Sequence, residues 1–195
     1  MAISAAEVKS LRDKTGLGMM DCKKALIEAG GDADKAVGLL RKRGHQVAAK
    51  KAGRTAKDGR IFSYIHHNGK VGVMVEVNCE TDFVAKSDAF QTFLKDICLQ
   101  ICAARPAAVQ REDMDPKAVE AEKEIACEQA KGKPENVIEK IVDGKLNKWF
   151  AEYVLLEQPF VKDDKQTIND VLAELTGKVG EKIVVKRFVR FELGE

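Results

Sequence analysis

The side chains that could do covalent or metal chemistry form no catalytic or metal-binding set in this chain. Cys98 and Cys102 share a predicted helix face, but no histidine accompanies them at ligand spacing, and no Cys-x-x-Cys pair occurs. His66 and His67 are adjacent at a predicted hairpin tip, where residues usually face water. We therefore expect reduced cysteines that mostly fill the core, and neither a metal nor a cofactor.

The common motifs of nucleotide-binding proteins and hydrolases are also missing. The chain contains no G-x-x-x-x-G-K-[ST] loop, no G-x-G-x-x-G after a strand, no H-E-x-x-H and no G-x-S-x-G. We expect a binding protein that is not an enzyme and that has no direct contact with a nucleotide.

One large apolar residue, Phe83, falls in a connection between two predicted elements. Residues 71–77 have valine at every second position, as in a half-buried strand, and residues 90–101 carry apolar side chains at helical spacing. Connections lie at the surface, so a phenylalanine there either folds back onto the core or contacts another protein. The residues themselves leave both options open.

Length and composition indicate a folded protein of one domain or two small ones. The chain has 195 residues, of which 45% are hydrophobic and 33% charged, enough to bury a core. No apolar run approaches the roughly 20 residues that span a bilayer, and Met1-Ala2-Ile3-Ser4 lacks the features of a secretory signal. We expect a cytoplasmic protein with no membrane partner.

The charge is small overall but unevenly placed. The formal net charge is +2, yet residues 41–60 contain eight lysines and arginines and one aspartate. This segment keeps open an alternative function, a nucleic-acid-binding module whose affinity would collapse steeply with salt.

The first 45 residues predict three short helices. Ser4 and Glu7 form a capping box, Gly30-Gly31 ends the second helix, and Asp32 caps a third that we expect to end at Gly44. Residues 46–59, rich in Ala, Gly and Lys, read as a basic linker.

The rest of the chain predicts an antiparallel sheet and a helical hairpin. Asn68-Gly69 predicts a tight turn between strands at 61–65 and 70–77, and a helix from about Ser87 ends before Arg105-Pro106. Asp115-Pro116 opens a charged helix that turns at Gly132-Lys133-Pro134 into a second one. Thr167 caps a helix that ends at Gly177, and residues 182–193 alternate as a strand, with Ile183, Val185, Val189 and Phe191 on one side.

Two separated stretches resemble the bacterial elongation factor Ts family. They are LRDKTGLGMMDCKKAL at residues 11–26 and VNCETDFVA at residues 77–85, and the resemblance continues through GKP at 132–134, QPFV at 158–161 and the final RFELGE. It implies an α+β fold: an N-terminal three-helix, ubiquitin-associated-like bundle, a small antiparallel sheet with packed helices, and a protruding helical hairpin. The domains would be residues 1–45, the basic linker 46–59, a core of 60–113 with 158–195, and the hairpin 114–157.

The resemblance implies a guanine-nucleotide exchange factor for elongation factor Tu, in its GDP-bound and nucleotide-free states, that acts in translation. The aromatic ring of the Thr-Asp-Phe-Val motif would insert into the partner and disturb its Mg²⁺ and phosphate site, and the bundle would contact another helix of the partner. Nucleic acid is then not an expected partner. The matching residues are Thr81, Asp82, Phe83 and Val84 in the motif and Arg12, Met19 and Met20 in the bundle, although Met20 could equally fill the core of the bundle.

This chain departs from longer relatives, which have two similar core subdomains where it has one. A lone core leaves a sheet edge or face uncovered. Short members of the family meet this need by homodimerising, so we expect a two-fold dimer through the core. A weaker alternative is a scaffold protein that docks through residues 115–153.

Overall fold

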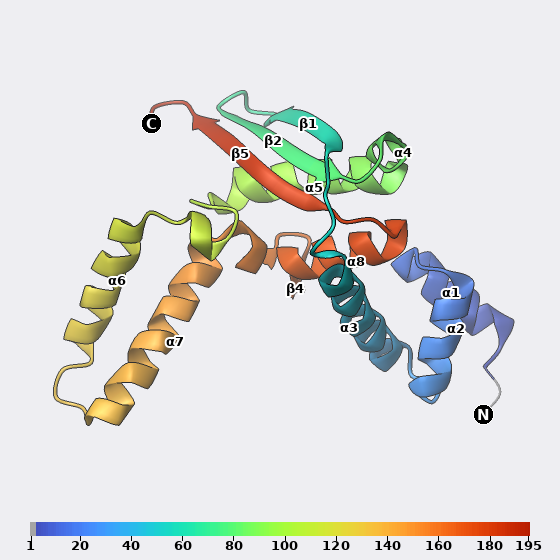
Figure 1. Ribbon diagram of the computed structural model, residues 1–195, viewed down its shortest axis with the longest axis horizontal. Helices are drawn as coiled ribbons and strands as arrows, with labels where there is room; N and C mark the ends of the chain where they lie inside the picture. Colours follow the sequence, from blue (N-terminus) through green and yellow to red (C-terminus); the bar gives the residue numbers. More distant parts are fainter. Residues whose placement is uncertain (1–2) are drawn as a thin grey trace. The chain divides into compact units, whose positions relative to one another are not determined.

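The computed structural model describes residues 3–195, except the side chains of residues 135 and 136, and shows the expected mixture of helices and sheet (Figure 1). Met1 and Ala2, at the start of the predicted bundle, lie outside the described residues. The chain divides into two compact units. The first comprises Met1–Arg60, Val77–Phe93 and Asp170–Val184, and the second comprises Ile61–Glu76, Leu94–Asn169 and Val185–Glu195.

A three-helix bundle opens the first unit: α1 (Ala5–Thr15), α2 (Met19–Glu28) and α3 (Ala33–Lys51). The predicted caps are confirmed, since Ser4 and Glu7 form a capping box and Asp32 accepts from the amides of Asp34 and Lys35. Among the described residues of the bundle, the buried apolar side chains that form its core are Val8, Leu11, Cys22, Ala25, Leu26, Ala36 and Leu40.

Two glycines that we expected to end helices lie inside helices instead. Helix α3 continues past Gly44 to Lys51, so residues 46–51 are helical rather than linker, and α8 (Ile168–Val179) continues past Gly177. A Cβ added to Gly44 would lie 3.1 Å from the carbonyl oxygen of Ala173, and one added to Gly177 would lie 3.5 Å from the Cα of Gly44. The glycines therefore serve a close crossing of α3 and α8, which the local sequence does not reveal.

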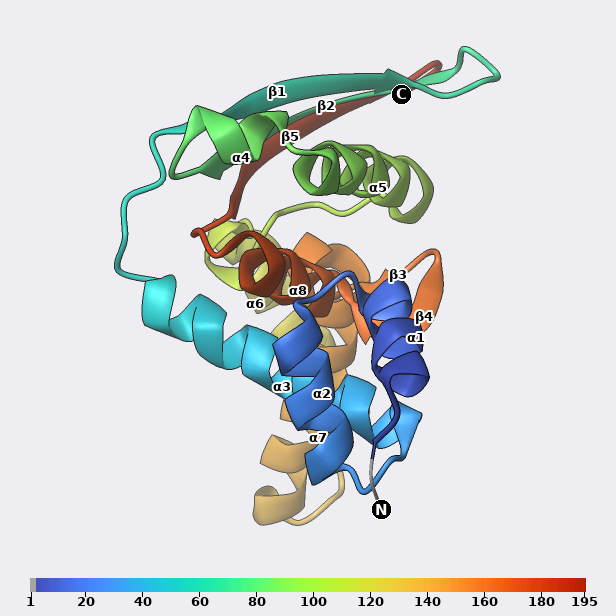
Figure 2. The same cartoon turned by 90° about the vertical axis from the view of Figure 1, so that its right-hand side faces the viewer.

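A three-stranded sheet with the order β1-β2-β5 is formed by β1 (Asp58–Ile65), β2 (Val71–Cys79) and β5 (Val184–Glu192). The Asn68-Gly69 turn joins β1 to β2 as predicted, with the amide of His66 donating to the carbonyl of Val71. Helix α5 (Asp88–Ala104) follows the short helix α4 (Asp82–Lys86) and ends before Arg105-Pro106 as expected. In the second unit α5 runs along one face of the sheet (Figure 2), and the buried valines of β2 alternate along that strand.

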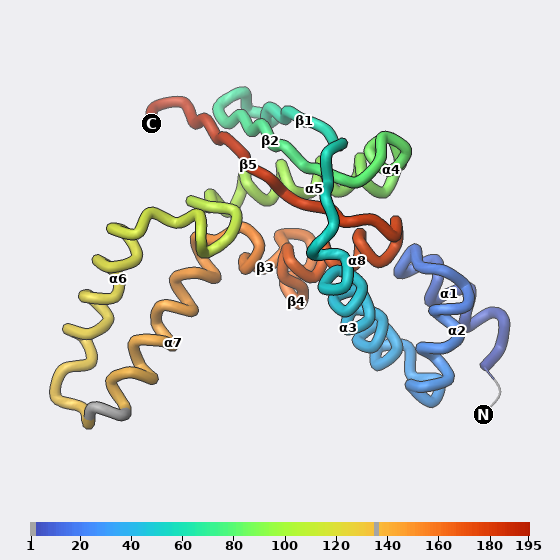
Figure 3. The backbone as a smooth tube through the Cα atoms, viewed as in Figure 1, coloured from blue at the N-terminus to red at the C-terminus, as the bar shows by residue number. Residues whose placement is uncertain are grey.

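The predicted helical hairpin is also present. Helices α6 (Pro116–Gln129) and α7 (Glu135–Tyr153) form its two arms, which Figure 3 traces, and Asp115 caps α6 ahead of Pro116. The single-turn helices η1 (Arg111–Asp113) and η2 (Leu155–Glu157) flank the hairpin, and a small sheet of β3 (Pro159–Phe160) and β4 (Asp163–Thr167), which we did not predict, follows it. Within residues 3–195 no helix combines the length and apolar character needed to cross a membrane.

Candidate functional site

Phe83 projects from the second residue of α4 and is 82% exposed. Its neighbours are less accessible: Val84 is half-buried and Ala85 is buried. The ring therefore does not fold back onto the core of its own chain. Of the two options left open by the sequence, the structure selects the exposed one.

The four residues of the motif are arranged by the cap of α4. Thr81 is the N-cap residue, with extended backbone angles, and its hydroxyl accepts from the amide of Val84 at 3.4 Å. Asp82 pairs with Lys86 one turn later at 2.6 Å, and this hydrogen bond holds the pKa of Asp82 below its ordinary value. A carboxylate in the first helical turn is also favoured by the helix dipole.

A second carboxylate, which sequence reasoning missed, contacts the same turn. Glu181, in the connection between α8 and β5, accepts from the amides of Glu80 and Thr81 at 3.1 and 3.0 Å and from the Thr81 hydroxyl at 2.7 Å. A lone glutamate about 100 residues downstream carries no local signal that could have pointed to this contact. Only the tertiary fold of the first unit brings it there.

The thiol of Cys79 lies beneath this turn, at the end of β2. Its Sγ donates to the carbonyl of Thr81 at 3.1 Å. Burial raises the pKa of the Cys79 thiol to about 11, and the negative charges of Glu181 and Asp58 add to the shift. The thiol is therefore protonated and unreactive at neutral pH.

The bundle residues implied by the resemblance are also exposed. Arg12 is exposed near the end of α1, and Met19 and Met20, which open α2, are 43% and 63% exposed. Met20 therefore does not fill the core of the bundle, which was the alternative role. Gly16 ends α1 with a positive φ of 67°, so the loop before α2 turns sharply.

The basic segment at residues 41–60 is partly neutralised by acidic side chains. Arg41 pairs with Glu174, Arg43 with Glu28 and Arg54 with Glu80. Three of the eight basic side chains of the segment thus lie beside carboxylates. The arrangement weakens the nucleic-acid alternative.

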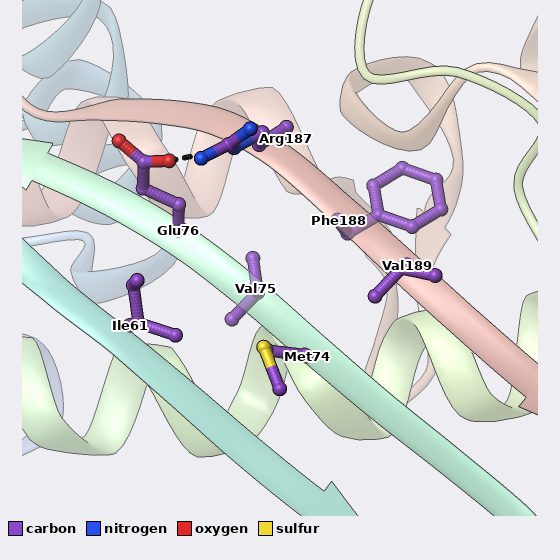
Figure 4. Close-up of a pocket in the computed structure, with 7 residues that line it drawn as sticks. All are labelled: Ile61, Met74, Val75, Glu76, Arg187, Phe188 and Val189. Carbon is purple, nitrogen blue, oxygen red and sulfur yellow. Dashed lines mark hydrogen bonds and ion pairs between the residues drawn. The ribbon is translucent and has the colours of Figure 1, made fainter.

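The second unit exposes an apolar sheet face. It carries Ile61, Ile65, Met74, Val189 and Phe191, here called the open face, all of which rank among the exposed large apolar side chains. Figure 4 shows residues that line a hollow on this part of the sheet, among them the ion pair of Arg187 and Glu76. The hollow has a volume of about 390 Å³, and the two charged groups of the pair are 2.7 Å apart. We expected Val189 and Phe191 on the same side as the buried Ile183 and Val185, but both are exposed. The less exposed positions of β5 are odd-numbered at its start and even-numbered from Phe188 onward.

The remaining candidate residues suggest no further chemistry. All five cysteines are free, and burial raises the pKa of Cys98 to about 12, with Cys102 contributing a smaller effect. His66 lies at the hairpin tip and contacts Tyr64 at 3.1 Å. Among the described residues, no group of three or more histidine, cysteine or acidic side chains could hold a metal.

Comparison with known proteins gives one consistent result. The family model described as "Elongation factor TS" matches residues 23–195. Proteins named elongation factor Ts from Thermoanaerobacter pseudethanolicus and Caldanaerobacter subterraneus subsp. tengcongensis are each 54% identical over 99% of this chain, covering 96% and 98% of their own lengths. That from Carboxydothermus hydrogenoformans is 55% identical over 99% of this chain and 90% of its own.

Proposed function

Because the chain belongs to the elongation factor Ts family, it is a nucleotide exchange factor for elongation factor Tu, and we propose that it releases GDP by inserting Phe83. In this proposal Thr81, Asp82, Phe83 and Val84 meet the partner, and the ring disturbs the elements that hold Mg²⁺ and the phosphates. The observation that carries the proposal is the 82% exposure of Phe83 on a helix of only five residues.

The family membership corrects the plain expectation that this chain is not an enzyme. A nucleotide exchange factor is not a catalytic enzyme in the usual sense, but it accelerates a step that takes place on another protein. Neither the family match nor the relatives show enzyme activity of the chain itself. The expectation that the chain is not an enzyme is therefore replaced by the statement that it is an exchange factor acting on another protein.

The free energy available from burying one phenylalanine indicates that Phe83 is one contact among several. Burying a phenylalanine stabilises a complex by about 1.5–3 kcal/mol, and about 1.4 kcal/mol corresponds to a tenfold change in a dissociation constant. By linkage, the bound nucleotide weakens the exchange factor by the same free energy with which the factor weakens the nucleotide. Further contacts must supply the rest, and the exposed Arg12, Met19 and Met20 suit that role because methionine adapts to a partner surface.

The open face of the sheet supports a homodimer as part of the proposal. A face that carries this many exposed apolar side chains is a candidate for contact with a second copy of the same face. Light scattering after size exclusion should give the mass of two chains at micromolar concentration. A monomer under these conditions would overturn this element of the proposal.

The partner states and the location are proposed on the same basis. The factor would engage the GDP-bound form of elongation factor Tu and remain bound to the nucleotide-free form, without contacting the nucleotide itself. It would act in the cytoplasm, where translation takes place. The nucleic-acid alternative is not favoured, given the family and the paired arginines of residues 41–60.

The central experiment follows the release of fluorescent GDP from elongation factor Tu in a stopped-flow instrument. Phe83→Ala should lower the rate of release tenfold or more, because truncation removes the burial of the ring, about 1.5–3 kcal/mol. The matched control is Val161→Ala, which truncates an exposed apolar residue of the second unit and should leave the rate unchanged. Equal rates for Phe83→Ala and the unmodified chain would refute the insertion.

A further inference from the structure

The helix that carries Phe83 is too short to fix the direction of the ring. Helix α4 has five residues, and a single turn is not stable without outside support, because nucleating a helix costs more than its first hydrogen bond returns. Phe83 itself is too exposed to be anchored by packing. Groups outside α4 must therefore hold its first turn.

Glu181 makes three of the side-chain hydrogen bonds that hold this turn, and the Cys79 thiol makes one more, to the Thr81 carbonyl. The two carboxylate oxygens of Glu181 accept three hydrogen bonds at 2.7–3.1 Å from two consecutive residues, Glu80 and Thr81. An ionised carboxylate can only accept, so the Thr81 hydroxyl must direct its proton toward Glu181. The lone pairs of that hydroxyl are then left for the amide of Val84, which is the bond that caps α4.

The segment that carries Glu181 is itself held in place. The amide of Lys182 donates to the Glu80 carboxylate at 2.7 Å, so neighbouring residues of the two segments bond reciprocally. The Lys182 ammonium donates to the carbonyls of Ala52 and Arg54 at 2.6 and 2.9 Å. These bonds tie the residues after α3, the turn before α4 and the connection after α8 into one charged network.

We propose that Glu181 is a positioning residue for nucleotide exchange, which acts by holding the Glu80-Thr81 turn so that Phe83 stays directed outward. The inference rests on the proposed role of Phe83. It assigns no partner contact to Glu181. A residue of this kind should change how well the inserted ring works more than how tightly the two proteins meet.

The test compares Glu181→Gln with the unmodified chain in the release of fluorescent GDP from elongation factor Tu. Glutamine keeps the size of the side chain but loses the charge and one of the two accepting oxygens. The saturating rate should fall about tenfold, since charge-assisted hydrogen bonds are the strong ones, and the half-saturating concentration should change less than about threefold. The matched control is Glu157→Gln, which removes a carboxylate that accepts from Arg111 in the second unit and should leave both values unchanged.

A double-mutant cycle separates positioning from general stabilisation. If Glu181 acts through Phe83, adding Glu181→Gln to Phe83→Ala should lower the rate by no more than about twofold further. Thermal unfolding shows whether Glu181→Gln remains folded. If it does not, Glu181→Asp replaces it in the cycle, because aspartate keeps the charge and shortens the side chain by one methylene group.

The outcomes distinguish this inference from the proposed function. If Phe83→Ala leaves the rate unchanged, the proposed function fails. If Phe83→Ala slows release but Glu181→Gln does not, only the positioning role fails. That role also fails if Glu181→Gln is equally harmful in both backgrounds or raises only the half-saturating concentration.

Discussion

Phe83 and the open face of the sheet are both exposed apolar surfaces, but they are built in opposite ways. The open face lies on paired strands, whose backbone hydrogen bonds fix the side of the sheet from which each side chain projects, and its apolar residues come from three strands. Phe83 stands alone on a five-residue helix whose first turn is held by Glu181. A broad face on a rigid support suits a lasting contact, whereas one ring on a supported turn suits a contact that is made and released in each cycle.

We expect the largest effect from a charge placed on the open face. Phe191 is 69% exposed on β5, and Phe191→Asp would place a carboxylate twice in the proposed two-fold interface, where an unpaired buried charge is costly. We expect the dissociation constant of the dimer to increase by about a hundredfold or more. Light scattering should then report the mass of one chain at micromolar concentration. Phe83→Asp is the matched control and should leave the mass unchanged. A dimer that survives Phe191→Asp would place the contact elsewhere.

The next effect concerns the support of the first unit. Gly44→Ala should lower the free energy of unfolding by about 1–3 kcal/mol, because the added methyl group forces α3 and α8 apart. Gly38→Ala is the control in the same helix, where an added Cβ meets nothing within 4 Å. It should stabilise the protein by about 0.5–1 kcal/mol. Chemical denaturation measures both, and equal effects of the two variants would contradict a close crossing.

A smaller effect sharpens the role of the exposed ring. Phe83→Leu keeps an apolar side chain but makes it smaller, so part of the apolar burial of the ring is retained. We expect GDP release to slow by less than about tenfold, between the unmodified chain and Phe83→Ala. If leucine were as harmful as alanine in the stopped-flow experiment, a specific aromatic contact rather than apolar filling would be required.

The smallest effect depends on pH. The amide of Lys182, followed by Arg54, holds the pKa of Glu80 below its ordinary value, so its ionised form is favoured in the folded protein. The resulting stabilisation is present above the ordinary carboxylate pKa and is lost as the pH falls through the lowered one. The melting temperature of the unmodified chain should therefore fall more steeply in that acid range than that of Glu80→Gln. If the melting temperatures of the two proteins fell in parallel with pH, ionised Glu80 would contribute nothing to stability in the acid range.

Most of the elements could be predicted because their signals are local. The Asn68-Gly69 turn, the Asp115-Pro116 start of α6 and the capping box at Ser4 each depend on neighbouring residues, and all three are present. The alternating valines of β2 likewise follow from the period of a strand with one buried face.

The wrong predictions concern residues whose environment is set by segments far apart in the chain. Gly44 and Gly177 look like helix ends from their neighbours, yet both lie where the two helices cross, and a Cβ at Gly44 would crowd the carbonyl oxygen of Ala173. The less exposed positions of β5 shift from odd-numbered to even-numbered residues along the strand. This shift depends on which part of the strand is covered, and the residues of β5 alone do not indicate it. Of the candidate site, the place of the motif between a strand and a helix could be predicted, but its exposure was one of two open options, and Glu181 could not be found.

The five cysteines differ enough in burial for the helical hairpin to be labelled selectively in solution. Cys22, Cys79 and Cys98 are buried and Cys102 is half-buried, while Cys127 is exposed on α6. A maleimide dye added at neutral pH should therefore modify Cys127 first, without any engineered residue. The unmodified chain thus carries its own attachment point for a fluorophore on the hairpin, and a change in emission when elongation factor Tu is added would report directly on whether that arm is touched.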